Sequence, residues 1–415
     1  MQTTLAPEFK GTRDGEAAEA ILRKCVHCGF CNATCPTYQL LGDELDGPRG
    51  RIYLIKQVLE GHAPTRATQL HLDRCLTCRN CETTCPSGVQ YGHLVDIGRK
   101  VVESKVERPL MERLTRTALK VGLTSPLFGP AMKLGQLVRP LLPATLKNKV
   151  PASGGARAHQ WPTREHPRKV LILLGCVQPA MAPNINAATA RVLDAAGIQT
   201  LVADGAGCCG AIRTHLNDAE GGLNDMRRNI DAWWPLVEGM TSAGKVEAIV
   251  MNTSGCGVTV KDYGHALAHD ADYADKAGRI SALTRDLSEL LPDLVDALKP
   301  KLKMAAPHRL AFHPPCTLQH GQQLRGGVET HLGALGFDVS ITTNESHLCC
   351  GSAGTYSVLQ PKLAYELRDR KLSHLAPLEA QTIISANIGC IQHLQSGTTT
   401  PVRHWVEVLD DALAP

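Results

Sequence analysis

Eight cysteines near the N-terminus have the spacing that holds iron–sulfur clusters. Two copies of the pattern C-x2-C-x2-C-x3-C-P begin at Cys25 and at Cys75. Thiolates at this spacing bind cubane [4Fe-4S] clusters, and the fourth cysteine of each run binds the other cluster. Zinc also accepts four thiolates but does not typically repeat this pattern. The expected ligands of the first cluster are Cys25, Cys28, Cys31 and Cys85, and those of the second are Cys75, Cys78, Cys81 and Cys35.

The other eight cysteines divide equally between two copies of an internal repeat. Each copy has a cysteine after an apolar run, then the sequence Cys-Cys-Gly, then a cysteine after a second apolar run. Four thiolates are enough for one metal site, and a glycine lets the backbone pass close to an inorganic centre. The expected metal ligands are Cys176, Cys208, Cys209 and Cys256 in the first copy, and Cys316, Cys349, Cys350 and Cys390 in the second.

The residues alone leave the identity of the metal in these repeats open. Adjacent cysteines can bind neighbouring irons of a cluster more easily than one ion, which favours a multi-iron centre over zinc; a redox dithiol without metal is the third interpretation. Three histidines, His313, His347 and His393, lie within three residues of these cysteines. A histidine there can bind metal or tune a cluster, although a packed position beside the ligands is the simpler interpretation of each.

The cysteines of each repeat must be positioned by strands that alternate with helices. Apolar, β-branched runs predict strands at 169–174, 246–252, 309–313 and 382–386. Helical patterns lie between them, at 187–196, 222–237, 328–335 and 362–375. This alternation indicates parallel βαβ units, whose strands all end at one edge of the sheet. Each repeat should therefore gather its four thiols in one crevice.

The whole chain of 415 residues is too long for one small core. We predict an α/β fold with a small α-helical ferredoxin-like N-terminal domain and duplicated parallel βαβ units in the C-terminal part. The predicted segments are a ferredoxin-like domain with two 4Fe-4S clusters at 1–107, a basic helical linker at 108–168, and two Cys-Cys-Gly repeats at 169–300 and 301–415. Short helices are expected at 17–24, 52–59 and 92–107, around the cluster motifs.

The predicted linker has an unusual charge pattern. Between Arg113 and Arg164 it contains nine lysines or arginines and no acidic residue, and it should form short broken helices followed by a loose stretch at 152–155. Such a segment can lie on anionic lipid, dock on an acidic partner, or simply pack as a connector against the cluster domain. All three interpretations stay open at this point.

Composition limits the classes of function and the location. The first ten residues lack a basic start followed by an apolar run, and no apolar segment approaches the ~20 residues of a spanning helix. Sixteen cysteines without an export signal indicate metal binding in a reducing compartment, so we expect a cytoplasmic protein, with peripheral attachment to the cytoplasmic side of the inner membrane left open. A net charge of +4 does not predict nucleic-acid binding, and no Gly-rich dinucleotide fingerprint predicts a flavin in this chain.

Longer sequence segments resemble those of the iron–sulfur subunits of glycolate oxidase (glycolate dehydrogenase). One runs from Cys25 to Ile52 and contains Leu-Asp-Gly-Pro-Arg-Gly-Arg-Ile. The others span 72–88, 229–234, 316–320, 347–356 and 386–390, so the resemblance covers nearly the whole chain and is weakest across 108–168. It implies an oxidoreductase complex in which flavin-bearing partner subunits oxidise glycolate to glyoxylate. This chain, not catalytic alone, would then pass electrons singly towards a membrane quinone or another acceptor.

The resemblance leaves several alternatives. The same logic suits the iron–sulfur subunit of a lactate or glycerol-3-phosphate dehydrogenase. A second alternative is an enzyme resembling heterodisulfide reductases, in which a Cys-Cys-Gly cluster itself cleaves a disulfide. In the wider family of Cys-Cys-Gly proteins the matching cysteines bind a non-cubane cluster or zinc, and relatives often add a further close cysteine where Cys256 and Cys390 stand alone here. Structural zinc in the repeats is therefore the third alternative.

Overall fold

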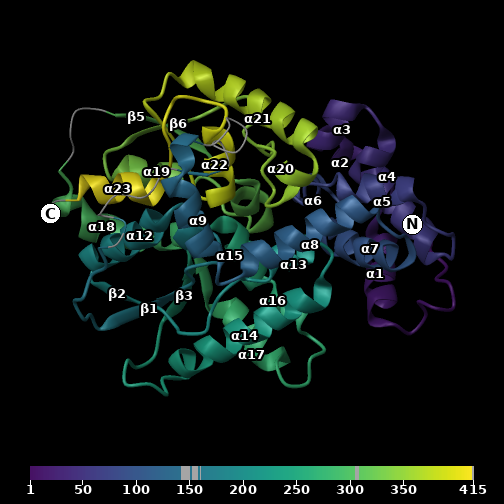
Figure 1. The fold of residues 1–415 in the computed structure, drawn as a ribbon, viewed down its shortest axis with the longest axis horizontal. Helices are drawn as coiled ribbons and strands as arrows, with labels where there is room; N and C mark the ends of the chain where they lie inside the picture. The colour runs from purple at the N-terminus through teal and green to yellow at the C-terminus, as the bar shows by residue number, and fades with distance from the viewer. Residues whose placement is uncertain (142–149, 152–157, 159, 304–307, 414–415) are drawn as a thin grey trace.

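The computed structural model describes residues 1–141, 150–151, 158, 160–303 and 308–413. A bundle of short helices at the N-terminal end adjoins two parallel sheets with flanking helices (Figure 1). The predicted fold class is therefore confirmed. The loose stretch expected at 152–155 lies outside the described residues.

The N-terminal unit contains helices and short connecting loops. Its elements are α1 (Arg13–Lys24), α2 (Phe30–Ala33), α3 (Pro36–Leu41), η1 (Glu44–Asp46), α4 (Pro48–Leu59), α5 (Arg66–Asp73), α6 (Asn80–Thr84) and α7 (Tyr91–Lys105). Local sequence explains their starts: Thr12 caps α1 by accepting a hydrogen bond from Gly15 N, and prolines occupy the first turns of α3 and α4. The apolar core of this unit includes Cys25, Cys75 and Cys81, so the thiols are part of the packing.

Two helices, α8 (Leu110–Thr124) and α9 (Phe128–Leu137), and the short η2 (Arg139–Leu141) follow the N-terminal unit. They lead across the molecule towards the repeats, where Gln136 Nε2 donates a hydrogen bond to Ala180 O at 3.2 Å (Figure 1). Both helices have no buried residue. Broken helices are thus found in the described part of the predicted linker.

Each repeat forms one four-stranded parallel sheet. The first sheet has the order β2-β1-β3-β4 and the second β6-β5-β7-β8, so the two have the same topology. The strands are β1 (Arg168–Ile172), β2 (Ile198–Leu201), β3 (Ala248–Met251), β4 (Thr284–Asp286), β5 (Arg309–His313), β6 (Asp338–Ile341), β7 (Thr382–Ser385) and β8 (Val402–His404). The four predicted strands correspond to β1, β3, β5 and β7; the sequence analysis missed the other four, which are short.

Helices cover the sheets and connect the strands. In the first repeat they are α11 (Gln178–Met181), α12 (Pro183–Ala195), α13 (Ala211–His215), α14 (Ala219–Glu238), α15 (Ser254–Lys261), α16 (Tyr263–Ala266), α17 (Ala274–Leu283), α18 (Leu287–Leu298) and η4 (Lys299–Lys301). In the second they are η5 (Thr317–Gly321), α19 (Gly327–Ala334), α20 (Tyr356–Leu359), α21 (Pro361–Leu375), η6 (Ala376–Leu378), α22 (Ile388–Gln395) and α23 (Trp405–Ala412). The helices predicted from the apolar periodicity correspond to α12, α14, α19 and α21.

The two repeats share one apolar core. Buried side chains of both sheets, such as Val170 and Phe312, belong to the same cluster, together with Leu291 of α18. A buried ion pair adds to this contact: Arg191 Nη2 of α12 lies 2.7 Å from Asp410 Oδ2 of α23. The repeats are therefore held in a fixed relation, which places their cysteine-bearing edges close together.

Candidate metal centres

The four cysteines predicted for the first cluster surround one cavity. Cys25, Cys28, Cys31 and Cys85 all line it, and Cys81 lines it as well. Cys85 thus lies with the three thiols of the other run, as the crossed pattern requires. We call these four residues the first cluster set.

Both motifs have the same unusual backbone. His27 and Thr77 occupy matching positions and have φ values of 61° and 52°, and Gly29 and Arg79 follow with 86° and 57°. Left-handed residues turn the chain tightly, so that successive cysteines converge on one point. A Cβ at Gly29 would also collide with the guanidinium of Arg49, so that flexible side chain would have to move.

The cysteines predicted for the second cluster, Cys35, Cys75, Cys78 and Cys81, also lie together; we call them the second cluster set. Burial raises the pKa of Cys81 well above its ordinary value, and the neighbouring thiolates of Cys78, Cys75 and Cys35 raise it further. Burial raises the pKa of Cys78 in the same way, with Cys316 of the second repeat as the next cause. Free thiols in this set hold their protons, and metal binding must displace them.

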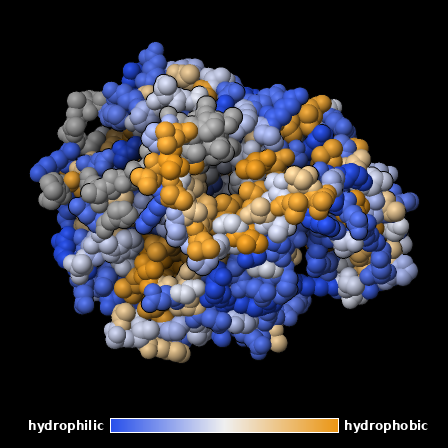
Figure 2. Space-filling view, in the orientation of Figure 1, coloured by the Kyte–Doolittle hydropathy of each residue, from blue (hydrophilic) through white to orange (hydrophobic). Residues whose placement is uncertain are grey.

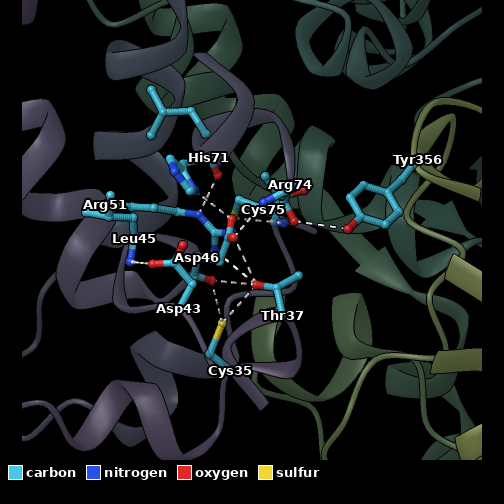
Figure 3. A network of polar contacts seen from close by, with 12 residues as sticks. Cys35, Thr37, Asp43, Leu45, Asp46, Arg51, His71, Arg74, Cys75 and Tyr356 are labelled. Atoms are coloured by element: carbon cyan, nitrogen blue, oxygen red, sulfur yellow. Dashed lines mark hydrogen bonds and ion pairs between the residues drawn. The ribbon is translucent and has the colours of Figure 1, made fainter. Parts of the chain in front are cut away.

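A buried network of polar contacts fixes the second cluster set (Figure 3). Asp46 is completely buried and accepts contacts from Arg74 at 2.8 Å, His71 at 3.1 Å and Arg51 at 3.4 Å. Its backbone oxygen accepts a hydrogen bond of 2.7 Å from Thr37 Oγ1, which in turn lies 3.3 Å from Cys35 Sγ. The sequence analysis assigned no role to Asp46.

In the first repeat the four predicted thiols form a chain of contacts. Cys208 contacts both Cys176 and Cys209, and Cys209 also contacts Cys256. Hydrogen bonds from Cys176 and Cys209 favour the charged form of Cys208 and lower the pKa of its thiol. A metal site needs sulfur atoms that lie close together and that can bind in the deprotonated form. We call these four cysteines the first repeat set.

Two side chains outside the cysteines hold the adjacent pair of the first repeat. Asn229 Nδ2 of α14 donates to Cys208 O at 2.7 Å, and Tyr263 Oη donates to Cys209 O at 2.9 Å. Asn229 also accepts a hydrogen bond from Gly207 N. The sequence analysis assigned no role to either side chain. An asparagine within a predicted helix, where asparagine has low propensity, is a weak sequence signal for Asn229.

The second repeat brings its four cysteines together in the same order. Cys316 Sγ lies 3.8 Å from Cys349 Sγ, Cys349 contacts Cys350, and Cys350 contacts Cys390. Asn387 Nδ2 donates to Cys390 Sγ at 3.7 Å. We call these cysteines the second repeat set. All sixteen cysteines are thus found in four groups, and none forms a disulfide.

The second repeat set packs directly against the second cluster set. Cys316 and Cys349 belong to an apolar cluster with Leu76 and Tyr356, and Cys78 packs against it. Tyr356 Oη donates a hydrogen bond of 3.1 Å to Arg74 O across the same contact. The N-terminal and C-terminal thiols therefore meet through one buried interface.

The first repeat meets the N-terminal unit at a different, polar contact. His93 Nε2 lies 3.0 Å from Asp262 Oδ2, and this hydrogen bond raises the pKa of His93. Arg79 approaches the same carboxylate at 3.5 Å, and the ring of His265 stacks on His93 with 3.8 Å between centroids. Burial lowers the pKa of His265, and the charge of His93 lowers it further.

A large cavity lies between the repeats and the N-terminal unit. Its volume is about 1110 Å³, and thiols of both repeat sets line it. Its wall also includes apolar side chains of α8 and α9, among them Leu123, Phe128 and Met132. The open space beside the repeat sets is large enough for a small-molecule ligand.

Comparison with known proteins assigns the chain to a family. The model of the 4Fe-4S dicluster domain matches residues 21–89, and that of the cysteine-rich domain matches 170–261 and 310–395. The glycolate oxidase iron–sulfur subunit of Escherichia coli (strain K12) is 55% identical over 414 residues, covering 100% of this chain and 99% of the relative. The chain belongs to the family of glycolate oxidase iron–sulfur subunits. Its 4Fe-4S dicluster domain fits a role in electron transfer.

More distant relatives include a probable glycolate oxidase iron–sulfur subunit from Bacillus subtilis (strain 168). It is 29% identical over 94% of this chain and 91% of its own length. Lactate utilization protein A of Geobacillus thermodenitrificans is 25% identical, but over only 58% of this chain. The thiol groups described above fit iron–sulfur centres, because each gathers four free cysteines without a competing disulfide.

Proposed function

We propose that this chain is the electron-transfer subunit of a complex that oxidises glycolate to glyoxylate. Flavin-bearing partner subunits would carry out the oxidation, and this chain would accept the electrons one at a time and deliver them to a membrane quinone or another acceptor. The chain is not catalytic alone. Iron–sulfur clusters, when bound, supply one-electron redox chemistry. The full-length similarity to a glycolate oxidase iron–sulfur subunit supports the choice of glycolate.

The packing of Cys78 against the apolar cluster that contains Cys316 and Cys349 carries the electron-transfer proposal. It joins the cysteines of the dicluster domain to those of the second repeat, with buried apolar side chains between them. We assign one [4Fe-4S] cluster to each cluster set, and one further metal centre, iron–sulfur or zinc, to each repeat set. If the repeat centres are iron–sulfur clusters, the protein would offer redox groups in the N-terminal unit and in both repeats.

Metal analysis and partner requirements test this proposal together. Anaerobically purified chain should contain acid-labile sulfide and either about 16 iron, or about 8 iron with up to two zinc. It should oxidise glycolate only after the flavin subunits are added. Glycolate oxidation by the isolated chain would overturn the proposal, as would colourless material without sulfide. Lactate and glycerol 3-phosphate, tested as substrates of the complex, distinguish the related dehydrogenases.

We also propose peripheral membrane binding through α8 and α9, on the cytoplasmic side of the inner membrane. No helix in the described ranges is both long and apolar enough to cross a bilayer. Exposed apolar side chains of this segment include Leu127, Leu134 and Leu137, which are 72%, 63% and 79% exposed, and hydrophobic residues gather on this face (Figure 2). With Lys133 and Arg139 nearby, the surface suits an anionic lipid headgroup layer.

A second candidate function rests on the large cavity. Because thiols of both repeat sets line it, a small disulfide could reach them, as the resemblance to heterodisulfide reductases implies. Reduction of a small disulfide by the reduced, purified chain would favour this function. Its absence, together with glycolate-dependent reduction of the chain in the complex, would favour electron transfer alone.

A further inference from the structure

The two repeats differ at one buried position beside their cysteines. Three residues before the first cysteine of its set, the first repeat has Leu173 and the second has His313. Leu173 is buried in an apolar cluster, as expected for the end of a parallel strand. His313 closes β5 and is only 1% exposed. The first repeat, with leucine at this position, can therefore be compared with the second to find what the histidine does.

The ring of His313 has no partner among the described residues. Neither Nδ1 nor Nε2 makes a hydrogen bond there, although both are buried. Burying a polar ring without a partner costs free energy, so such groups in folded proteins usually bind something. A nitrogen of this ring and the sulfurs of Cys350 and Cys390 all lie within 4.8 Å of one another. The histidine thus faces half of the second repeat set.

At a second position, too, the first repeat has a buried apolar residue and the second a buried polar one. In the helix after the Cys-Cys-Gly sequence, the first repeat has the fully buried Ile230, whereas the second has Lys371 at the same distance from its cysteine pair. Lys371 is 2% exposed, and its ammonium group donates to the backbone oxygens of Glu345 and Ser346. A buried cation beside thiolates stabilises an electron-rich centre. At these two positions the second repeat is therefore the more polar and the more positive of the two.

We propose that His313 is a nitrogen ligand of the metal centre held by the second repeat set, so that the two repeats hold chemically different centres. The inference rests on the proposed metal binding by the repeat cysteines. A neutral imidazole carries less negative charge than a thiolate. Where the centre is iron–sulfur and the ring takes the place of one thiolate, the ligand set carries one negative charge fewer, which together with Lys371 makes the second centre easier to reduce than the first. The centre that packs against Cys78 would then be the better electron acceptor of the two.

The direct test is spectroscopic and uses the intact holoprotein. Protein labelled with ¹⁵N-histidine is prepared anaerobically and reduced. Pulsed EPR should then show a strongly coupled ¹⁵N nucleus on one centre, or, if the centre is zinc, X-ray absorption at the zinc edge should show a nitrogen neighbour at about 2.0–2.1 Å beside sulfur at about 2.3 Å. The signal should disappear in His313→Leu, which gives the second repeat the residue of the first. Strong coupling that persists in His313→Leu, or its absence in the wild type, would overturn the proposal.

Two variants separate this inference from the function on which it rests. His404→Asn replaces an equally buried histidine of β8, two strands away from β5 in the same sheet, with a residue that can also cap α23, and it should leave the ¹⁵N signal and metal content unchanged. Cys350→Ser should remove metal from the second repeat. If Cys350→Ser keeps its full metal content, the metal assignment of the repeats fails. If Cys350→Ser loses metal while His313→Leu keeps the wild-type spectrum and midpoint potential, only the role of His313 fails.

Discussion

Replacing Asp46 by asparagine should destabilise the N-terminal unit strongly. The carboxylate is fully buried and compensates Arg51, which is itself only 1% exposed, while Arg74 and His71 approach it from two other sides. The substitution keeps the size of the side chain but leaves a guanidinium buried without its counter-charge. Removing one partner of a buried ion pair costs about 3–5 kcal/mol. A domain of this size loses about 4–8 °C of unfolding temperature per kcal/mol, so the expected decrease is at least about 12 °C.

The assay is thermal unfolding of anaerobic holoprotein, followed by visible absorption and by circular dichroism. All variants are heated at one scan rate, because irreversible unfolding makes the midpoint depend on the rate. If clusters are bound as proposed, their visible absorption should be lost at a lower temperature in Asp46→Asn than in the wild type, because Thr37 connects Asp46 to Cys35. An unfolding temperature of Asp46→Asn within about 2 °C of the wild type would refute it.

Two matched controls test whether burial and location decide the result. Glu247→Gln breaks a pair with Arg168 in which both side chains are more than a third exposed, and such pairs contribute about 0.2–1 kcal/mol, so little should change. Asp410→Asn breaks a buried pair with Arg191 that lies between the repeats. It should lower the unfolding temperature of the C-terminal part. The temperature at which the visible absorption of the N-terminal unit is lost should stay as in the wild type.

The remaining predictions concern contacts between the units and with lipid. Because the bond to Asp262 raises the pKa of His93, the charged form stabilises the fold at low pH. His93→Gln should therefore cost most stability below about pH 6.5 and less as the pH rises through the folded-state pKa, which thermal unfolding in a pH series measures. Leu134→Glu should reduce flotation with anionic vesicles at unchanged unfolding temperature, and equal flotation would contradict lipid binding by α9. Tyr356→Phe removes the hydrogen bond to Arg74 and should cost about 1 kcal/mol by calorimetry, whereas an exposed hydroxyl would cost nothing measurable.

Local spacing predicted which thiols lie together, but not what surrounds them. The crossed position of Cys85 beside Cys25 follows from the motif alone, and the apolar runs before Cys176 and Cys316 indicated β1 and β5. By contrast, β2 and β6 were missed, because Ile198–Leu201 and Asp338–Ile341 are four residues long and mostly half-buried or exposed. A strand without a continuous apolar run gives little sequence signal.

Partners distant along the chain were beyond sequence reasoning for a physical reason. Asp46 is compensated by Arg51, His71 and Arg74, which come from α4, α5 and the residue after α5. Each of these side chains looks like an ordinary surface charge until the helices pack. In the same way, the sequence places His313 three residues before Cys316, but only the fold shows that its ring is buried and faces Cys390.

The two repeats differ in how they contact the N-terminal unit, and this difference bears on which of them would receive electrons. Only the second repeat shares a buried apolar contact with Cys78, through Cys316 and Cys349, whereas the first meets the N-terminal unit through the polar pair of His93 and Asp262. Apolar burial excludes water from the space between redox groups, and a polar contact does not. If both repeats hold redox centres as proposed, the buried Lys371 and the unpartnered ring of His313 make the second repeat the better acceptor. The geometry therefore favours a path that enters the C-terminal part through the second repeat.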